Sequence, residues 1–296
     1  MTHMTRGLLI AAIAAAFSVS TLAQATRTFV STNGNDLNTA FNCSASASCR
    51  SFGAALSVTF PAGEIVVLNS GGYGPATISH PVVITAIGVV ASISTITSGA
   101  NALTISTPGF VTIRGLNLHG EGVGANGVVV TQSGVFLRFF NLLVENFTAD
   151  GVNFGTPGKL FIYNSQFNDN QNTGLHMTDP SGNTYVDSSS FNHNGQGVQL
   201  DFGFAVIADS SAEYNFDGFL ADGGILTLFR DRVASNTTGL RTNFTGTLSF
   251  ANCLITNNLT AYEIDMGSMN GTNDGTSLIT PGQTVIGSLS ASSLLQ

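Results

Sequence analysis

Hydrophobic and polar positions alternate along this chain in short runs that recur at a nearly constant interval. From residue 127 onward, a glycine is followed by apolar, polar, apolar and polar positions, and this motif returns every 21 to 24 residues. Alternation with a period of two is typical of a strand with one buried face. Each copy of the motif therefore predicts a short, half-buried strand. The glycine places are Gly127, Gly151, Gly174, Gly197, Gly218 and Gly239, with Ala261 in the next one.

Further columns keep the same phase. Three or four residues before the glycine lies an asparagine column: Asn170, Asn194, Asn215, Asn236 and Asn258. Two apolar columns lie upstream of it: Phe167, Phe191, Ala212, Val233 and Ile255, and Ile162, Val186, Ile207, Leu228 and Phe250. Three short strands and three turns per unit predict one coil of a right-handed parallel β-helix, because such a coil buries its apolar face only by stacking on its neighbours. The frame of a leucine-rich repeat, the main rival at this period, is absent.

These units and their asparagine column resemble the parallel β-helix repeats of the pectin-lyase-like superfamily. The segments FVSTNGNDLN, CRSFGAAL, PAGEIVVLNSGGYGP and PVVITAIG are similar to the entry region of secreted right-handed β-helix repeat proteins. The resemblance implies an all-β fold, a three-sheet right-handed parallel β-helix of about nine coils. It implies no single activity, because that fold carries lyases, hydrolases, esterases, adhesins and inert scaffolds.

Four segments are expected along the chain: a signal peptide over 1–25, an N-terminal cap over 26–62, the β-helix over 63–266, and an irregular C-terminal cap and tail over 267–296. The cap is predicted to contain a helix over 51–60 that closes the end of the coil stack. Ser51 is its expected N-cap residue, and Phe52, Ala55, Leu56 and Phe60 share one face.

The N-terminus has the features of a secretory signal peptide. A cationic start, an apolar run of 13 residues and Ala23-Gln24-Ala25 predict cleavage before Thr26. The run is too short to cross about 30 Å of hydrocarbon, and no later stretch is long and apolar enough either. We therefore expect a secreted, periplasmic or extracellular protein without an integral membrane segment.

Export makes a disulfide between Cys43 and Cys49 the expected state of those two residues. Cys253 is left over. It falls in a column otherwise occupied by Ser165, Ser189, Ser210 and Asp231, which favours a packed small residue over a reactive nucleophile.

Composition narrows the function classes. Charged residues make up only 9% of the chain and hydrophobic residues 43%, which excludes ordinary disorder. The net charge of −8 predicts that the protein as a whole repels nucleic acid and anionic membranes. The asparagine column is predicted to satisfy the backbone of a turn, which also removes most of the glycosylation potential of the sequons at Asn146, Asn236 and Asn258. The sequence predicts no metal site and no cofactor.

The candidate ligand surface is the outward side of the repeated strand, where polar residues gather on consecutive coils. Enzymes that share the resembled fold bind saccharides on such a sheet face. Asp201 and Asp222 are expected one coil apart, about 5 Å, close to the carboxylate spacing of a retaining glycosidase. The alternative is that a solvent-facing strand simply carries polar residues. The candidate binding residues are His176, Gln199, Asp201, Asp222, Arg241, Glu263 and Asp265, with the turn residues Asp169, His193 and Tyr214 next; catalytic residues stay unassigned.

Three functions remain open. The first is a non-catalytic extracellular or surface-associated binding protein that contacts polysaccharide. The second is a polysaccharide hydrolase or lyase that uses the acidic residues of the outward strand. The third is a purely structural scaffold. The residue patterns of polygalacturonases and the acidic cluster of a pectate-lyase-like calcium site are absent, and aromatic sugar platforms are scarce because the chain has no Trp and five Tyr.

Overall fold

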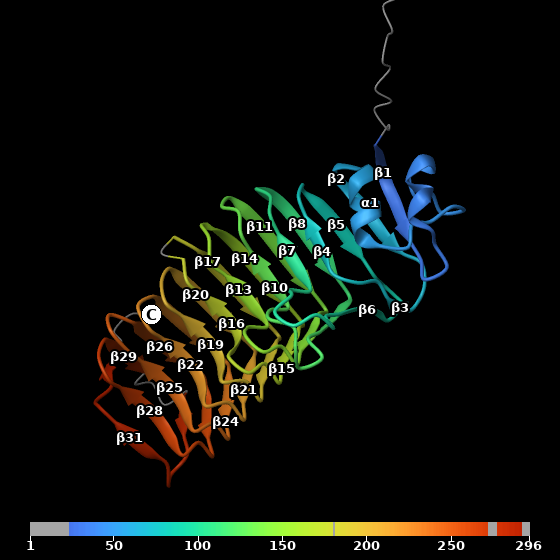
Figure 1. Cartoon of the computed structure of the whole chain (residues 1–296). Coiled ribbons are helices and arrows are strands. Elements are labelled where there is room, and N and C mark those ends of the chain that lie inside the picture. The colour runs from blue at the N-terminus through green and yellow to red at the C-terminus, as the bar shows by residue number, and fades with distance from the viewer. Residues whose placement is uncertain (1–23, 180, 272–276, 292–296) are drawn as a thin grey trace, which may run out of the picture.

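The computed structural model describes residues 24–179, 181–271 and 277–291. The predicted signal peptide lies almost entirely outside these residues. Within them the chain winds into a right-handed parallel β-helix with three long sheets, which confirms the predicted fold (Figure 1). In the described part of the chain, no helix is long and apolar enough to cross a membrane.

Each coil visits sheet 1, sheet 2 and sheet 3 in turn, and every strand pairs in parallel with its counterparts in the neighbouring coils. The strands of sheet 1 are β1 Ala25–Val30, β2 Thr59–Val67, β5 Val82–Thr85, β8 Gly109–Arg114, β11 Val135–Phe140, β14 Gly158–Tyr163, β17 Asn183–Asp187, β20 Phe204–Ala208, β23 Ile225–Phe229, β26 Thr247–Ala251, β29 Ser268–Gly271 and β32 Ser290–Ala291. Those of sheet 2 are β3 Gly71–Gly72, β6 Ala91–Ser94, β9 Leu116–His119, β12 Leu143–Glu145, β15 Gln166–Asn168, β18 Ser190–Asn192, β21 Ser211–Glu213, β24 Arg232–Ala234, β27 Leu254–Thr256 and β30 Leu278–Ile279. Those of sheet 3 are β4 Ala76–Ile78, β7 Leu103–Ile105, β10 Val128–Val130, β13 Val152–Phe154, β16 Thr173–Met177, β19 Gln196–Leu200, β22 Asp217–Ala221, β25 Thr238–Thr242, β28 Thr260–Ile264 and β31 Thr284–Ile286.

The predicted apolar columns form the core. Their members pair in register from coil to coil, so apolar side chains lie directly above one another. The rings of Phe167 and Phe191 are stacked with centroids 5.1 Å apart, and both side chains are fully buried. One continuous hydrophobic cluster runs from the N-terminal cap to the last coils, which is the physical reason why the stack is stable.

The asparagine column is structural, as expected. The backbone N–H of each asparagine donates to the side-chain oxygen of the asparagine one coil further on, for example from Asn194 to Asn215 over 2.8 Å. The side-chain amide of Asn215 donates to the carbonyl oxygen of Phe191 and to the side chain of Asn236. The ladder thus satisfies buried backbone groups at the turn between sheets 2 and 3.

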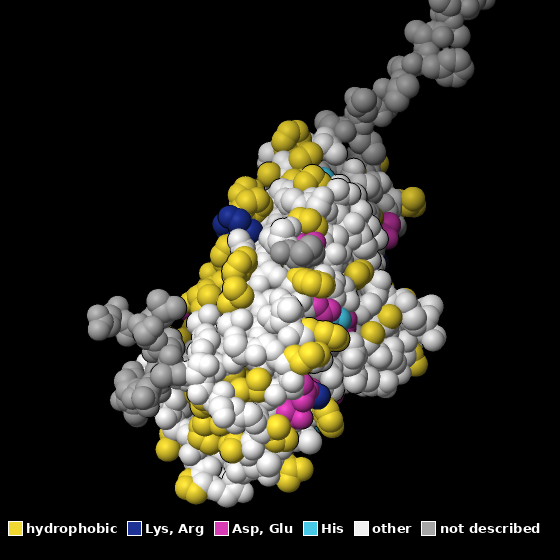
Figure 2. All heavy atoms as spheres, turned by 90° about the vertical axis from the view of Figure 1, so that its left-hand side faces the viewer, with side chains coloured by type: hydrophobic (Ala, Val, Ile, Leu, Met, Phe, Trp, Pro, Cys, Tyr) yellow, Lys and Arg dark blue, Asp and Glu magenta, His cyan; other side chains and the backbone are white. Residues whose placement is uncertain are grey.

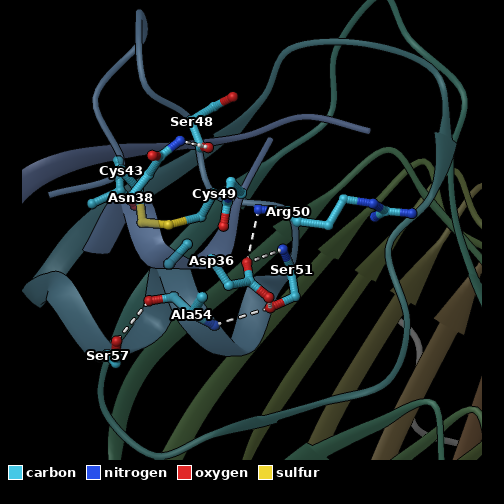
Figure 3. The surroundings of a disulfide bond; sticks show 12 residues. Asp36, Asn38, Cys43, Ser48, Cys49, Arg50, Ser51, Ala54 and Ser57 are labelled. Atoms are coloured by element: carbon cyan, nitrogen blue, oxygen red, sulfur yellow. Dashed lines mark hydrogen bonds between the residues drawn. A yellow bond between two sulfur atoms is a disulfide. The ribbon is translucent and has the colours of Figure 1, made fainter. Parts of the chain in front are cut away.

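The N-terminal end is closed by α1 (Phe52–Val58), and η1 (Asp36–Phe41) lies before it. Ser51 caps α1 by accepting from the backbone N–H of Ala54, and Asp36 accepts from the backbone N–H groups of Arg50 and Ser51 (Figure 3). A disulfide joins Cys43 to Cys49 beside this helix. The predicted helix is wrong in its last residues: Phe60 lies in β2 and is 53% exposed, because the chain after Val58 pairs with β1 instead.

The C-terminal region also differs from the prediction. The described residues after 267 are not irregular: β29, β30, β31 and β32 add further rungs to the three sheets. Gln283 continues the asparagine ladder, because its longer amide accepts from the backbone N–H of Asn258 and donates to the carbonyl oxygen of Ile255. A substitution of Gln for Asn hid this coil from the repeat pattern.

Candidate functional site

The outward side of sheet 3 carries the predicted polar positions in register. Asn153, His176, Gln199, Leu220, Arg241 and Glu263 pair from β13 to β28. Asp201, Asp222 and Asp265 follow directly after β19, β22 and β28. Figure 2 shows two groups of charged side chains on one face, acidic ones beside a histidine and, nearer the C-terminal coils, acidic ones beside a basic one.

The first group, here called the His176 cluster, consists of Asp150, His176, Gln199 and Asp201. The ring Nδ1 of His176 lies 3.1 Å from Asp150 Oδ2, and its Nε2 lies 3.1 Å from Asp201 Oδ2. Gln199 donates its amide to the other oxygen of Asp201 over 2.7 Å. Asn172 donates to Asp150 over 2.6 Å, so the carboxylates on both sides of the imidazole are held in place.

These contacts set the protonation states of the cluster. Burial by itself lowers the pKa of His176, but the hydrogen bonds and charges of Asp150 and Asp201 raise that pKa to about 9. Burial raises the pKa of Asp201, and the hydrogen bonds from His176 and Gln199 outweigh it and hold the pKa below its ordinary value. At neutral pH the cluster is therefore an imidazolium between two carboxylates.

The second group, here called the Arg241 cluster, consists of Asp217, Arg241, Glu263 and Asp265. The guanidinium of Arg241 donates to Asp265 Oδ2 through Nε and Nη2, over 2.9 and 2.6 Å, and its Nη1 lies 3.6 Å from Asp217 Oδ2. Burial raises the pKa of Asp217 to about 6, although the charge of Arg241 opposes the shift. Burial and then the charge of Asp265 raise the pKa of Glu263.

The two clusters share one arrangement. In each, the basic side chain is at the third place of the strand motif, and it contacts an aspartate on the preceding coil. This aspartate stands directly before the motif glycine of that coil: Asp150 for His176 and Asp217 for Arg241. The basic side chain also contacts an aspartate on the following coil, at the fifth place of the strand motif: Asp201 for His176 and Asp265 for Arg241. The basic residues lie on β16 and β25, three coils apart, which is about 14 Å at the ordinary strand spacing.

Asp222 and Leu220 lie on the coil of β22, which also carries Asp217 of the Arg241 cluster. Leu220 occupies an outward place yet is only 8% exposed, so it separates the two charged groups with an apolar step. Burial and then the charge of Asp201 raise the pKa of Asp222. The one-coil pair of Asp201 and Asp222 therefore has its two pKa values shifted in opposite directions.

Two residues of the site were missed in the sequence. Asp150 and Asp217 stand directly before a column glycine and are almost fully buried, whereas the predicted site residues of the strand occupy its third and fifth motif places. The signal was present, since both lie 24 to 26 residues before the basic residue that they contact. Among the described residues, no group of three or more His, Cys, Asp or Glu side chains has the geometry of a metal site.

The alternative turn residues make no comparable site. Asp169, His193 and Tyr214 all have left-handed backbone conformations beside the asparagine ladder, and the rings of His193 and Tyr214 stack with centroids 4.9 Å apart. The turn itself explains Asp169 and His193, because Asp and His adopt φ near +55° more readily than β-branched or bulky residues do.

Comparison with known proteins is consistent with the fold. Residues 101–275 match the family described as "Right handed beta helix region". The chain belongs to the right-handed β-helix family. It is similar in structure to pectate lyase Pel9A, with 17% identity, a TM-score of 0.68, and coverage of 92% of this chain and 80% of the lyase.

A weaker structural similarity connects this β-helix protein to the mannuronan C-5 epimerase AlgE4 A-module of Azotobacter vinelandii. The identity is 13%, the TM-score 0.49, and the coverage 76% of this chain and 91% of that module. No curated protein matches the chain significantly in sequence. At these identities the similarities concern the fold, and the site must be interpreted from its own residues.

Proposed function

We propose that this protein binds a neutral polysaccharide along the outward face of sheet 3. The observation that carries the proposal is the repetition of one charged arrangement, the His176 cluster and the Arg241 cluster, three coils apart on a single line. A linear polymer with a repeat near 5 Å presents equivalent groups to both clusters at once. Carboxylates outnumber cations along this line, which favours hydroxyl groups over anionic groups as the contacts.

The side chains are already ordered before any ligand arrives. Asp201 is held by His176 and Gln199, and Arg241 is held by Asp265. Binding to such a surface loses little side-chain entropy, so moderate contacts suffice for useful affinity.

The test is calorimetric titration of soluble neutral polysaccharides into the wild type and into the Asp201→Asn and Asp222→Asn variants. We expect the affinity to fall about tenfold or more in each variant, because each loses a charge-assisted hydrogen bond worth roughly 1.5–3 kcal/mol. Asp209→Asn is the matched control, since Asp209 pairs with Arg230 at a turn away from sheet 3. Absence of binding to every neutral glycan, or unchanged affinity in both variants, would contradict the proposal.

A second candidate function is polysaccharide cleavage. It is favoured by the opposite pKa shifts of Asp201 and Asp222, because neighbouring carboxyl groups whose surroundings move their pKa values apart are typical of general acid–base pairs. Release of new reducing ends from a glycan that the protein binds would support it. Loss of that release in Asp222→Asn, with binding retained, would assign the acid to Asp222.

We also infer that the protein is exported and that residues 1–25 are removed. The support is the cationic start, the short apolar run and the Ala-x-Ala end of the segment. Mass analysis of protein recovered from the secreted fraction tests this, with Thr26 expected as the first residue.

A further inference from the structure

The outward face of sheet 1 carries a patch of a different chemistry. On β8, β11 and β14, three consecutive coils present three outward side chains each, in register. Eight of the nine are aromatic or basic, and the ninth is Thr112. The cation–aromatic patch consists of Phe110, Arg114, Phe136, Arg138, Phe140, Lys159, Phe161 and Tyr163.

The charge of this patch is uncompensated. Its three strands contain no Asp or Glu, although the whole chain has 17 acidic residues and 9 basic ones. Arg114, Arg138 and Lys159 form no ion pair with any residue that the structure describes. Arg27, Arg230, Arg232 and Arg241, by contrast, each pair with a carboxylate.

The cations are held against ring faces. Arg114 lies 5.3 Å from the ring centroid of Phe140, Arg138 lies 5.4 Å from that of Phe110, and Lys159 lies 5.2 Å from that of Phe136. The rings also contact each other, with centroids 4.9 Å apart for Phe110 and Phe136. The charged groups are thus ordered while they stay at the surface, and Phe110 remains 55% exposed.

We propose that this patch docks the protein onto an anionic phospholipid bilayer. The patch is two-dimensional, about 10 Å across the strands and about 13 Å along them, so a flat surface contacts all its members at once. A single polymer chain would contact only one row of it. The next strand, β17, presents Asn183, Tyr185 and Asp187 beside the patch. Beyond β17, apolar side chains return on the same sheet face, where Phe204 is 55% exposed and Ile225 is 43% exposed.

Aromatic and basic side chains together are the combination that suits the lipid interface. The cations approach the negative headgroups, and the rings enter the boundary between headgroups and acyl chains. The net charge of −8 does not prevent this contact. Charges more than about 8 Å away are largely screened at physiological salt, so the local charge of the docking face decides.

Vesicle flotation with the full chain tests the proposal, using phosphatidylcholine vesicles with and without phosphatidylglycerol. We expect binding only when phosphatidylglycerol is present, and release as salt is raised. The triple variant Arg114→Gln, Arg138→Gln, Lys159→Gln should bind about 100-fold more weakly, since each basic residue near an anionic surface contributes about 1 kcal/mol.

The control is a second triple variant with the same change in net charge: Arg27→Gln, Arg230→Gln and Arg232→Gln. These three cations are exposed but already paired with carboxylates, so vesicle binding should stay within about threefold of the wild type. Asp201→Asn should also bind vesicles normally, because sheet 3 plays no part in this contact. Circular dichroism confirms that each variant is folded.

Three results would overturn the proposal: no binding of the wild type to vesicles that contain phosphatidylglycerol, retained binding in the first triple variant, or equal loss in both triple variants. If the wild type instead bound soluble polygalacturonate through these three cations and ignored vesicles, the patch would be a site for an acidic polysaccharide.

Discussion

Each basic side chain on the outward face of sheet 3 is held by carboxylates from the coils on either side of its own. His176 contacts Asp150 and Asp201, and Arg241 contacts Asp217 and Asp265. The stacking of coils brings together residues that lie 24 to 26 positions apart in sequence. The protonation states of these side chains therefore depend on the stacking of the coils. The pH dependence of the free energy of unfolding measures those protonation states.

We expect His176 to make the folded state less stable as the pH rises from about 6.5 to about 9. Its pKa is about 9 in the fold and 6.5 in the unfolded chain, so its contribution is complete below pH 6.5 and is lost as the pH passes 9. Urea unfolding at several pH values should show a shallower decline in His176→Gln than in the wild type. His193→Gln is the control, because that side chain is exposed. Equal slopes in the wild type and His176→Gln would contradict the assignment.

At the scale of the strand and its turns, two features hold one coil against the next: rows of stacked apolar core side chains, and glycines beside the asparagine ladder. A Cβ atom added to Gly151, Gly174, Gly197, Gly218 or Gly239 would lie 2.5–2.7 Å from a carbonyl oxygen of the following coil and 2.9–3.1 Å from a ladder amide. The glycine column thus exists because the backbones approach closely, and its positions do not need a positive φ.

Gly197→Ala should therefore destabilise the protein by about 1–3 kcal/mol, the usual cost of overpacking. Its Cβ would lie 2.5 Å from the oxygen of Gly218, and that oxygen belongs to a sheet that cannot retreat. Gly53→Ala is the matched control: it lies in α1 with open space around it and should gain up to about 1 kcal/mol in helix propensity. Chemical denaturation measures both changes, and a neutral Gly197→Ala would show that the coils can separate freely.

The stacked phenylalanines make an independent prediction. Phe191→Ala should lower the free energy of unfolding by about 3–5 kcal/mol, because it removes a fully buried ring from the row that contains Phe167. Phe204→Ala, at a 55% exposed position of sheet 1, should cost less than about 1 kcal/mol. A loss below about 1 kcal/mol for Phe191→Ala would mean that the column does not carry the core.

For the whole molecule, the solenoid separates its chemistries by face. Sheet 3 displays the line of paired charges, sheet 1 displays the cation–aromatic patch, and the interior is one apolar column. α1 with its neighbouring disulfide closes one end, and β29 to β32 are the last rungs that the structure describes at the other. The rate at which the buried thiol of Cys253 reacts with a reagent measures how often the later coils open.

Native protein should react slowly with an alkylating reagent at neutral pH. Cys253 is 2% exposed and burial raises its pKa to about 12, so little thiolate is present and the sulfur is inaccessible. Mass spectrometry should find one modified cysteine only after unfolding, and three after unfolding and reduction, because Cys43 and Cys49 are joined. Rapid native labelling of Cys253 would mean that the coil around β27 opens readily.

The sequence by itself determined the fold, because a β-helix repeats one local pattern and each coil must bury the same columns. The apolar rows, the asparagine ladder and the glycine column could all be predicted, since their partners occupy the same place in the next repeat. Phe60 and the last rungs were mispredicted where that rule fails. Phe60 lies in the irregular part of β2 opposite the non-repeating β1, and Gln283 takes the place of an asparagine in the ladder.

Only the tertiary structure decided which polar residues meet. Asp150 and Asp217 reach their basic partners diagonally, from a different motif place on a neighbouring coil, and a search along columns does not find diagonal contacts. The same holds for Arg114, Arg138 and Lys159. They occupy three different columns, and only the sheet register places them in one patch. Periodicity determines what is stacked, whereas the direction and length of each side chain determine what it touches.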